Sequence, residues 1–181
     1  IRQGLKVHEI HKYRQISLME LAERIANQIK EWKPQGTFVD SVGVGAGVTD
    51  RLRQLGYKVF EVNAGENAGQ EQKYYNKRIE IWDKMKLWLK EADIPNDDEL
   101  KQELIGPEYG FDRRGRLQLE KKSDMKKRGL NSPDTADAIS MSFAFPLVLN
   151  EKAKVLTPAE KDWLIITGQG NQGKMTTVQG Y

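Results

Sequence analysis

The chain has 181 residues, of which 38% are hydrophobic and 30% are charged, and its formal net charge is +3. This length fits one globular domain with an extension, and the lack of any run of about 18 apolar residues excludes a membrane-spanning helix. The sequence has no cysteine, which excludes disulfides and thiolate metal sites. A bound metal would therefore have oxygen or imidazole ligands, which favours Mg²⁺ or Mn²⁺ over structural zinc.

The N-terminal part predicts a strand followed by an amphipathic helix. Residues 5–11 largely alternate between apolar and polar side chains, as in a strand. Ser17 is expected to cap the helix, with Glu20 completing a capping box, and an apolar stripe continues as far as Trp32. Because another strand follows, the order is that of a crossover unit, in which the two strands could lie parallel in one sheet. The chain begins with Ile1 rather than Met, and we expect it to be a piece of a longer protein.

Asp40 lies near the end of a short apolar run that leads into alternating glycines. The pattern predicts a buried strand that stops at a glycine loop, where a carboxylate is costly to bury unless a cation meets it. The loop also permits a dinucleotide-binding interpretation, in which Gly43 and Gly45 begin G-x-G-x-x-G and Glu61 binds a ribose. Val48 stands at the third glycine position, which weakens this alternative.

The rest of the chain alternates between further helices and strands. We predict a short helix over residues 49–55, a strand over 57–62, a long helix over 73–92, a brief helix from Asp97 or Asp98 to Leu104, a hairpin over 109–120, one helical turn over 123–129, and a last helix capped by Ser132 with Pro133 at its first position. The apolar stripe of the long helix includes Ile79, Trp82 and Met85, which we interpret as core rather than as a base-stacking platform. These elements predict an α/β domain.

A basic segment extends from residue 113 to residue 128, with eight basic and two acidic residues and a net charge of +6. The rest of the chain carries −3. The basic residues are Arg113, Arg114, Arg116, Lys121, Lys122, Lys126, Lys127 and Arg128. Such a patch is typical of a polyanion-binding surface, although a solvated charged hairpin explains it equally well when the segment is taken alone.

Asp134 and Asp137 lie three residues apart near the start of the last predicted helix, so their side chains share one face. An acid in the first turn complements the helix dipole, which explains Asp134. Asp137 is expected more than one turn into the helix, beside Ala136 and Ile139, where an acid needs a partner and a metal ion would serve. Two-metal phosphodiester hydrolysis uses several carboxylates around ions about 4 Å apart, to which Asp40 and Asp137 could contribute if they meet. The residues alone leave the dipole and metal interpretations open.

Three stretches resemble the nuclease domain of the large terminase subunits of tailed phages. Residues 37–52 are similar to its second acidic motif, and residues 74–78 resemble its middle helix. Residues 119–129, followed by 132–138, are similar to its closing motif. The resemblance implies an RNase H-like (RuvC-like) α/β fold with a mixed central sheet flanked by helices on both faces.

The resemblance also implies a Mg²⁺- or Mn²⁺-dependent endonuclease that cuts concatemeric viral DNA during packaging, with two ions at its site. Asp40 matches the second acidic ligand, Asp137 the last, and Asp134 an auxiliary acid, while the basic segment would hold the phosphates of double-stranded DNA. The implied partners are the terminase ATPase domain, the small terminase subunit and the portal. The implied location is the host cytoplasm, at the procapsid portal.

One departure from the family concerns its first acidic residue, which lies on a strand just upstream of where this sequence starts. The run from Arg2 to Gly4 resembles the turn after that strand. We therefore expect weak metal binding, so that either an upstream segment supplies the acid or this piece is inactive. A non-catalytic DNA-binding or assembly domain is the main alternative, and a dinucleotide-binding module is a lesser one.

We expect the nuclease domain to cover residues 1–149 and a flexible extension to cover residues 150–181. Within the extension, residues 168–174 fit the phosphate-binding pattern G-x-x-x-x-G-K. Met175 follows where Ser or Thr must hold Mg²⁺, and too few residues remain to form a helix. We therefore reject a P-loop there.

Overall fold

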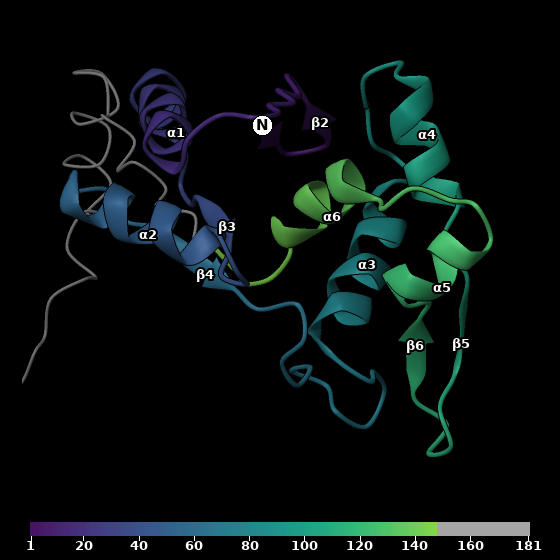
Figure 1. Ribbon diagram of the computed structural model, residues 1–181. Helices are drawn as coiled ribbons and strands as arrows, with labels where there is room; N and C mark the ends of the chain where they lie inside the picture. The colour runs from purple at the N-terminus through teal and green to yellow at the C-terminus, as the bar shows by residue number, and fades with distance from the viewer. Residues whose placement is uncertain (148–181) are drawn as a thin grey trace, which may run out of the picture. The chain divides into compact units, whose positions relative to one another are not determined.

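The computed structural model describes residues 1–147. The predicted extension, its boundary at residue 149 and the rejected P-loop stretch lie outside this part. In chain order the elements are β1 (Arg2–Gln3), β2 (Lys6–Val7), α1 (Leu18–Trp32), β3 (Phe38–Asp40), α2 (Gly45–Gln54), β4 (Phe60–Val62), α3 (Lys77–Trp88), α4 (Asp98–Ile105), β5 (Tyr109–Phe111), β6 (Leu117–Leu119), α5 (Lys122–Lys127) and α6 (Asp134–Met141) (Figure 1). Helices and short strands are interspersed along the chain, which confirms the α/β class.

Helix α1 begins where the sequence predicts. The backbone N–H of Glu20 donates a hydrogen bond of 3.1 Å to Oγ of Ser17, which is the N-cap. The Glu20 carboxylate accepts from Arg24 at 2.7 Å instead of reaching back to Ser17, so half of the predicted capping box forms. Lys33 ends the helix in the left-handed conformation, with φ of 45°, directly before Pro34.

Strands β3 and β4 pair in parallel and are connected by α2. Phe38 lies opposite Phe60, and Asp40 lies opposite Val62. Helix α2 begins at Gly45, earlier than predicted, and packs against α1. The apolar contact between α1, α2 and the chain before β4 is made by Ala22, Ala26, Val48, Leu52 and Val59. This unit places the end of β3 beside the start of α2.

Helix α3 is shorter than predicted at both ends. Its N-cap is Asn76, whose side chain accepts a hydrogen bond from the N–H of Ile79 at 3.3 Å. The residues before it bond to β6 instead of continuing the helix, because Leu117 donates to the carbonyl of Lys73 at 2.8 Å and accepts from the N–H of Tyr75 at 2.9 Å. A tertiary contact therefore sets the start of α3.

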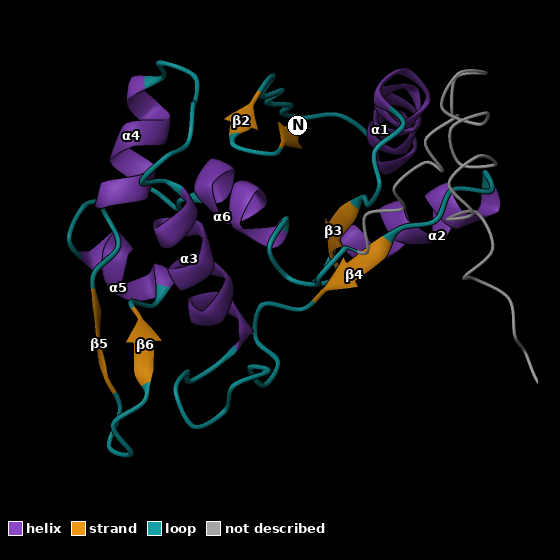
Figure 2. Ribbon diagram, turned by 180° about the vertical axis from the view of Figure 1, so that it is seen from behind, coloured by secondary structure: helices purple, strands orange, loops and turns teal. Residues whose placement is uncertain are grey.

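The strands of residues 1–147 form three separate two-stranded sheets (Figure 2). The mixed central sheet is therefore not confirmed. The N-terminal strand and β3 do not share one sheet within residues 1–147, since β2 covers only Lys6–Val7 and pairs antiparallel with β1. One reason is that the N–H of Val7 donates to the carbonyl of Asp93 at 2.9 Å, so β2 is bonded to the segment after α3.

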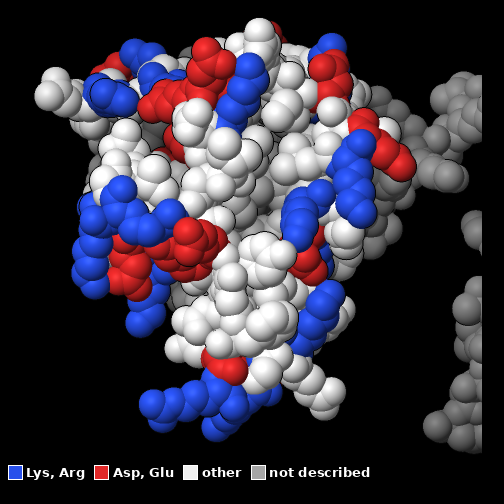
Figure 3. All heavy atoms as spheres, turned by 90° about the vertical axis from the view of Figure 1, so that its right-hand side faces the viewer, with Lys and Arg blue, Asp and Glu red and all other residues white. Residues whose placement is uncertain are grey.

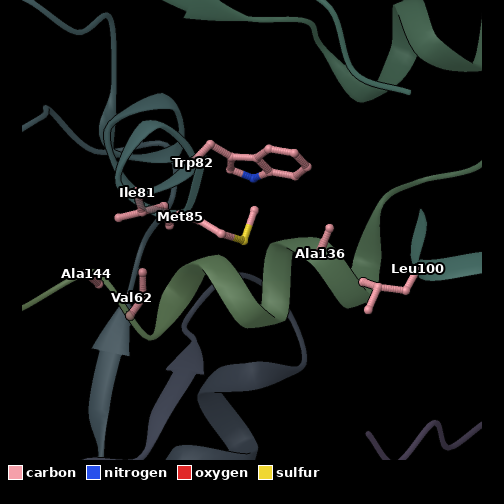
Figure 4. Packing of buried hydrophobic residues seen from close by; sticks show 7 residues of the cluster. All are labelled: Val62, Ile81, Trp82, Met85, Leu100, Ala136 and Ala144. Carbon is pink, nitrogen blue, oxygen red and sulfur yellow. The ribbon is translucent and has the colours of Figure 1, made fainter. Parts of the chain in front are cut away.

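Helix α6 lies between α3 and the β3–β4 pair in the described part of the chain, as both ribbon views show. Figure 4 shows the side chain of Met85 on α3 directed toward α6, beside Trp82. The buried residues of this core are Val62, Ile81, Trp82, Met85, Leu100, Ala136 and Ala144. Ile79, Trp82 and Met85 are all buried, so their predicted role in the core is confirmed.

Candidate functional site

Asp40 is the last residue of β3 and is exposed to solvent. Its Oδ1 accepts a hydrogen bond of 3.0 Å from the N–H of Val42, so the side chain itself closes the turn that follows the strand. The chain reverses at Gly43, with φ of 67°, and a Cβ at position 45 would collide with the carbonyl oxygen of Asp40. This turn exposes Asp40 to solvent, so burial gives its carboxylate no need of a cation, and Phe38 and Val39 are partly buried rather than buried as predicted for the strand.

Asp137 lies on α6 with its side chain 19% exposed, and three donors surround its carboxylate. Trp82 Nε1 donates to Oδ1 at 2.7 Å, and Arg78 Nε lies 3.2 Å from the same oxygen. Lys122 Nζ lies 2.8 Å from Oδ2. Arg78 and Trp82 are one turn apart on α3, so that helix supplies both groups from one face. The protein itself therefore provides the partners that the sequence analysis expected Asp137 to need.

The start of α6 also differs from the prediction. The N-cap is Pro133 rather than Ser132, and the N-cap residue's own side chain makes no capping hydrogen bond. Asp134 is the first helical residue, so Asp137 lies in the first turn rather than beyond it. The helix dipole consequently favours both carboxylates.

Lys122 bridges the two acids of α6. Its Nζ lies 3.1 Å from Oδ1 of Asp134 and 2.8 Å from Oδ2 of Asp137. Burial would lower the pKa of Lys122, but its hydrogen bonds and charge interactions with Asp137 and Asp134 outweigh burial and raise that pKa above its ordinary value. Asp134 is 77% exposed, so the bridge is open to solvent on one side. Two carboxylates thus converge on a single cationic group at the surface.

Glu103 on α4 holds the beginning of α6 in place of a local cap. Its Oε2 accepts a hydrogen bond of 2.8 Å from the N–H of Ala136, and its Oε1 accepts one of 3.2 Å from Oγ1 of Thr135. Sequence reasoning missed Glu103, and it missed Arg78 and Trp82 as partners of Asp137. These contacts join residues 32 to 59 positions apart, so no local spacing signals them.

Glu80 fixes the part of α3 that carries Arg78 and Trp82. It is 3% exposed, and its carboxylate accepts hydrogen bonds from Lys84 at 2.7 Å, from the N–H of Gly69 at 2.8 Å and from Lys77 at 3.2 Å. Burial would raise the pKa of Glu80, but the three donors together lower it. The bond to Gly69 also ties the loop before α3 to the helix.

The structure brings two of the three predicted ligands together. Asp134 and Asp137 share Lys122, whereas no hydrogen bond or ion pair joins Asp40 to either of them within residues 1–147. Helix α6 does pack against β3, so the two elements are neighbours. In the same part of the chain, no group of three or more His, Asp or Glu side chains is placed to hold a metal ion.

The predicted basic segment divides into two halves. Four of its eight residues are engaged by carboxylates: Arg116 by Asp112, Lys122 by Asp134 and Asp137, Lys127 by Asp124, and Arg128 by Glu120 and Glu108. The other four are Arg113, Arg114, Lys121 and Lys126, which form no ion pair with any side chain of residues 1–147. These four are the positions whose charge is free to meet a polyanion.

No protein family matches the sequence, and no curated protein matches it either. Solved structures do match. The nuclease domain of the large terminase subunit of bacterial virus Sf6 is 21% identical, with a TM-score of 0.67 over 80% of each chain. A lysine-to-alanine variant of that domain, with manganese and beta-thujaplicinol, gives the same values, and such a variant with calcium is 22% identical with a TM-score of 0.64 over 80% of each chain. The chain has the fold of that nuclease domain, which confirms the resemblance predicted from the motifs.

Proposed function

We propose that this domain is the nuclease of a phage DNA-packaging terminase and that it cuts concatemeric DNA by metal-dependent phosphodiester hydrolysis. The observation that carries the proposal is the convergence of Asp134 and Asp137 on one cationic group, on a fold shared with a terminase nuclease domain. Neither feature alone assigns the activity, because one fold can host many functions and acids often pair with lysine.

The two carboxylates at the start of α6 are ligands of the kind that a hard divalent cation takes. Asp134 and Asp137 offer carboxylate oxygens, which suit Mg²⁺ and Mn²⁺, and the Lys122 ammonium already stands between them as a cation. A divalent ion held there would polarise the scissile phosphodiester and lower the pKa of a bound water. Two acids give an incomplete ligand set, so the site we propose also requires Asp40 and the first acid that the resemblance places upstream.

The residues of the candidate site have different roles in this proposal. Trp82 and Arg78 orient Asp137 by hydrogen bonds to Oδ1, and Arg78 also reaches Oδ2 at 3.5 Å, the oxygen that faces Lys122. Asp134, being exposed, adjusts to the ligand as an auxiliary acid. Asp40 approaches from the end of β3, and its carboxylate has a single backbone donor to give up or share.

We further propose that double-stranded DNA lies against the free half of the basic segment. Arg113 and Arg114 at the tip of the β5–β6 hairpin would contact phosphates without reading sequence, as would Lys121 at the N-cap of α5 and Lys126 within it. By family analogy the other partners are the terminase ATPase domain, the small terminase subunit and the portal, and the place of action is the procapsid portal in the host cytoplasm. No helix within residues 1–147 is long and apolar enough to cross a membrane.

A non-catalytic DNA-binding domain is the second candidate. It is favoured by the fact that Arg78, Trp82 and Lys122 already satisfy Asp137 without a metal. A dinucleotide-binding module is less well supported, since Glu61, the proposed ribose ligand, pairs with Arg53.

A plasmid-nicking assay separates the nuclease from the binder. A chain extended upstream to include the first acid should nick supercoiled plasmid with Mn²⁺ and should stop when EDTA is added. Asp40→Ala should abolish nicking while DNA binding persists, and Asp50→Ala, which removes an exposed acid of α2, should leave nicking unchanged. If the extended wild-type chain binds DNA but never nicks it, the domain is a binder and the proposal fails.

A further inference from the structure

Two aromatic side chains stand exposed on one strand of the β5–β6 hairpin. Tyr109 is 61% exposed and Phe111 is 72% exposed. They are two residues apart on β5, so both lie on the same face of the hairpin. On that face Leu117 and Leu119 of β6 pack against the core cluster of Tyr74 and Ile79, whereas the β5 half is left uncovered within residues 1–147.

The surroundings of these rings are cationic. Arg113 and Arg114 follow Phe111 at the tip of the hairpin and form no ion pair in the described part of the chain. Lys86 of α3 places its Nζ 4.8 Å from the centre of the Tyr109 ring. Figure 3 shows the molecule from the right-hand side of Figure 1, which is the side of β5. Lys and Arg atoms gather at the lower end of this view, and the hairpin tip lies at the lower end of Figure 1.

The tip is held in a defined shape by Asp112. Its Oδ1 accepts hydrogen bonds of 2.9 Å from the N–H groups of both Arg114 and Arg116, and its Oδ2 accepts one of 2.8 Å from Nε of Arg116. Gly115, with φ of 75°, completes the turn. Asp112 and Arg116 therefore neutralise each other while they present the side chains of Arg113 and Arg114 outward.

The acids near the hairpin are also paired with cations, although one arginine serves two of them. Arg128 pairs with Glu120 at 2.6 Å and with Glu108 at 3.0 Å, and Lys127 pairs with Asp124 at 2.7 Å. These acids help to line a depression of about 330 Å³ beside the hairpin, together with Tyr109, Phe111 and Lys121. The charges of these three acids are balanced by Arg128, Lys127 and Lys121, so the excess positive charge beside the rings is that of Arg113 and Arg114.

We propose that the face of the hairpin carrying Tyr109 and Phe111 binds an unpaired DNA strand, with bases stacked on the two rings and phosphates held by Arg113 and Arg114. Aromatic platforms beside unpaired cations are what single-strand binding requires. The two Cα atoms are about 7 Å apart along the strand, which is about twice the 3.4 Å rise per base in one strand of a duplex. One base therefore fits between the rings. An acidic peptide would use the arginines but would gain little from the stacking surface.

This inference extends the proposed function, because it adds a site for a frayed or cut end to a domain expected to hold duplex DNA. It does not need a metal or an intact acidic site. Binding is therefore measured in EDTA on the 181-residue chain, so that failure of the nuclease proposal leaves the result interpretable.

The test measures the affinity of the chain for two labelled DNAs by fluorescence anisotropy at several salt concentrations. One is an oligothymidylate of about 16 nucleotides, a typical site size for a single strand, and the other is a duplex of the same length. Phe111→Ala should weaken oligothymidylate binding by about 5- to 150-fold, the range for one lost stacking contact. It should leave the salt slope and the duplex affinity unchanged, and Phe111→Tyr should restore binding. Arg113→Ala should instead reduce the slope for the single strand by about 0.7.

Ile105→Ala is the matched control, since Ile105 is 74% exposed but lies on α4, outside the hairpin, and it should have no effect. Equal losses for duplex and single strand in Phe111→Ala would overturn the proposal, as would no loss at all. A change in oligomeric state of Phe111→Ala by light scattering, with DNA binding intact, would assign the face to protein contact and would also overturn it.

Discussion

Asp40 and Asp137 occupy opposite environments. The carboxylate of Asp137 is enclosed by Trp82, Arg78 and Lys122, and it connects α6 to α3 and α5. Within residues 1–147, the carboxylate of Asp40 receives one hydrogen bond, from the backbone of Val42, and the residue is exposed. The charge of Asp137 thus contributes to the fold as well as to the candidate site, whereas the charge of Asp40 contributes almost nothing to the fold. The two residues should respond differently to the same substitution.

The largest expected effect is on cutting by Asp40→Ala. In the chain extended upstream, nicking with Mn²⁺ should fall at least about 100-fold, or about 2.7 kcal/mol of transition-state stabilisation. The free energy of unfolding should change by less than about 1 kcal/mol, because an exposed side chain with one hydrogen bond is removed. Plasmid nicking and urea denaturation measure the two quantities. A variant that cuts normally would remove Asp40 from the site, and one that unfolds readily would give it a structural role.

Asp137→Asn, unlike Asp40→Ala, should have a large effect on stability, with a loss of about 2–4 kcal/mol in the free energy of unfolding. The substitution leaves Arg78 and Lys122 without their shared charge, and breaking a pair in this partly buried setting is costly. Urea denaturation measures the loss. Asp134→Asn is the control, and it should cost less than about 1 kcal/mol because that carboxylate is 77% exposed. Equal costs for the two variants would contradict the difference in environment.

Elements specified by local contacts could be predicted from the sequence. Ser17 caps α1 and Asp97 caps α4, each by a hydrogen bond to an N–H three residues along, so short-range spacing is enough to locate both helices. Where a distant residue competes, the local pattern fails. Lys73 bonds to Leu117 instead of entering α3, and Glu103 replaces Ser132 at the start of α6.

The candidate site was predictable only as a list of acids. The motifs identified Asp40, Asp134 and Asp137, but they could not show that Lys122, predicted to bind DNA, pairs with two of them. Which charges are free and which are neutralised depends on tertiary packing. Arg78 illustrates the same point, because it reaches Asp137 across 59 positions of sequence.

Gly45→Ala tests whether the turn after β3 determines where Asp40 lies. A Cβ at this position would collide with the Asp40 carbonyl, so the turn must open, and we expect a loss of about 1–3 kcal/mol in the free energy of unfolding. Gly110→Ala in β5 is the control, because nothing lies within 4 Å of an added Cβ there. Denaturant unfolding compares the two variants, and equal stabilities would show that the turn tolerates the methyl group.

The smallest expected effect is on Mn²⁺ affinity, and it results from removing Lys122, the side chain that already pairs with Asp137. In Lys122→Ala the ammonium no longer competes for the oxygens of Asp134 and Asp137, so Mn²⁺ should bind about tenfold more tightly, a change of about 1.4 kcal/mol. Titration calorimetry of the 181-residue chain measures this affinity without any cutting. Lys127→Ala, also on α5 but paired with Asp124, should leave it unchanged. Weaker Mn²⁺ binding in Lys122→Ala would mean that the lysine positions the two acids for the metal, and Asp137 would then depend on all three of its partners to serve as a ligand.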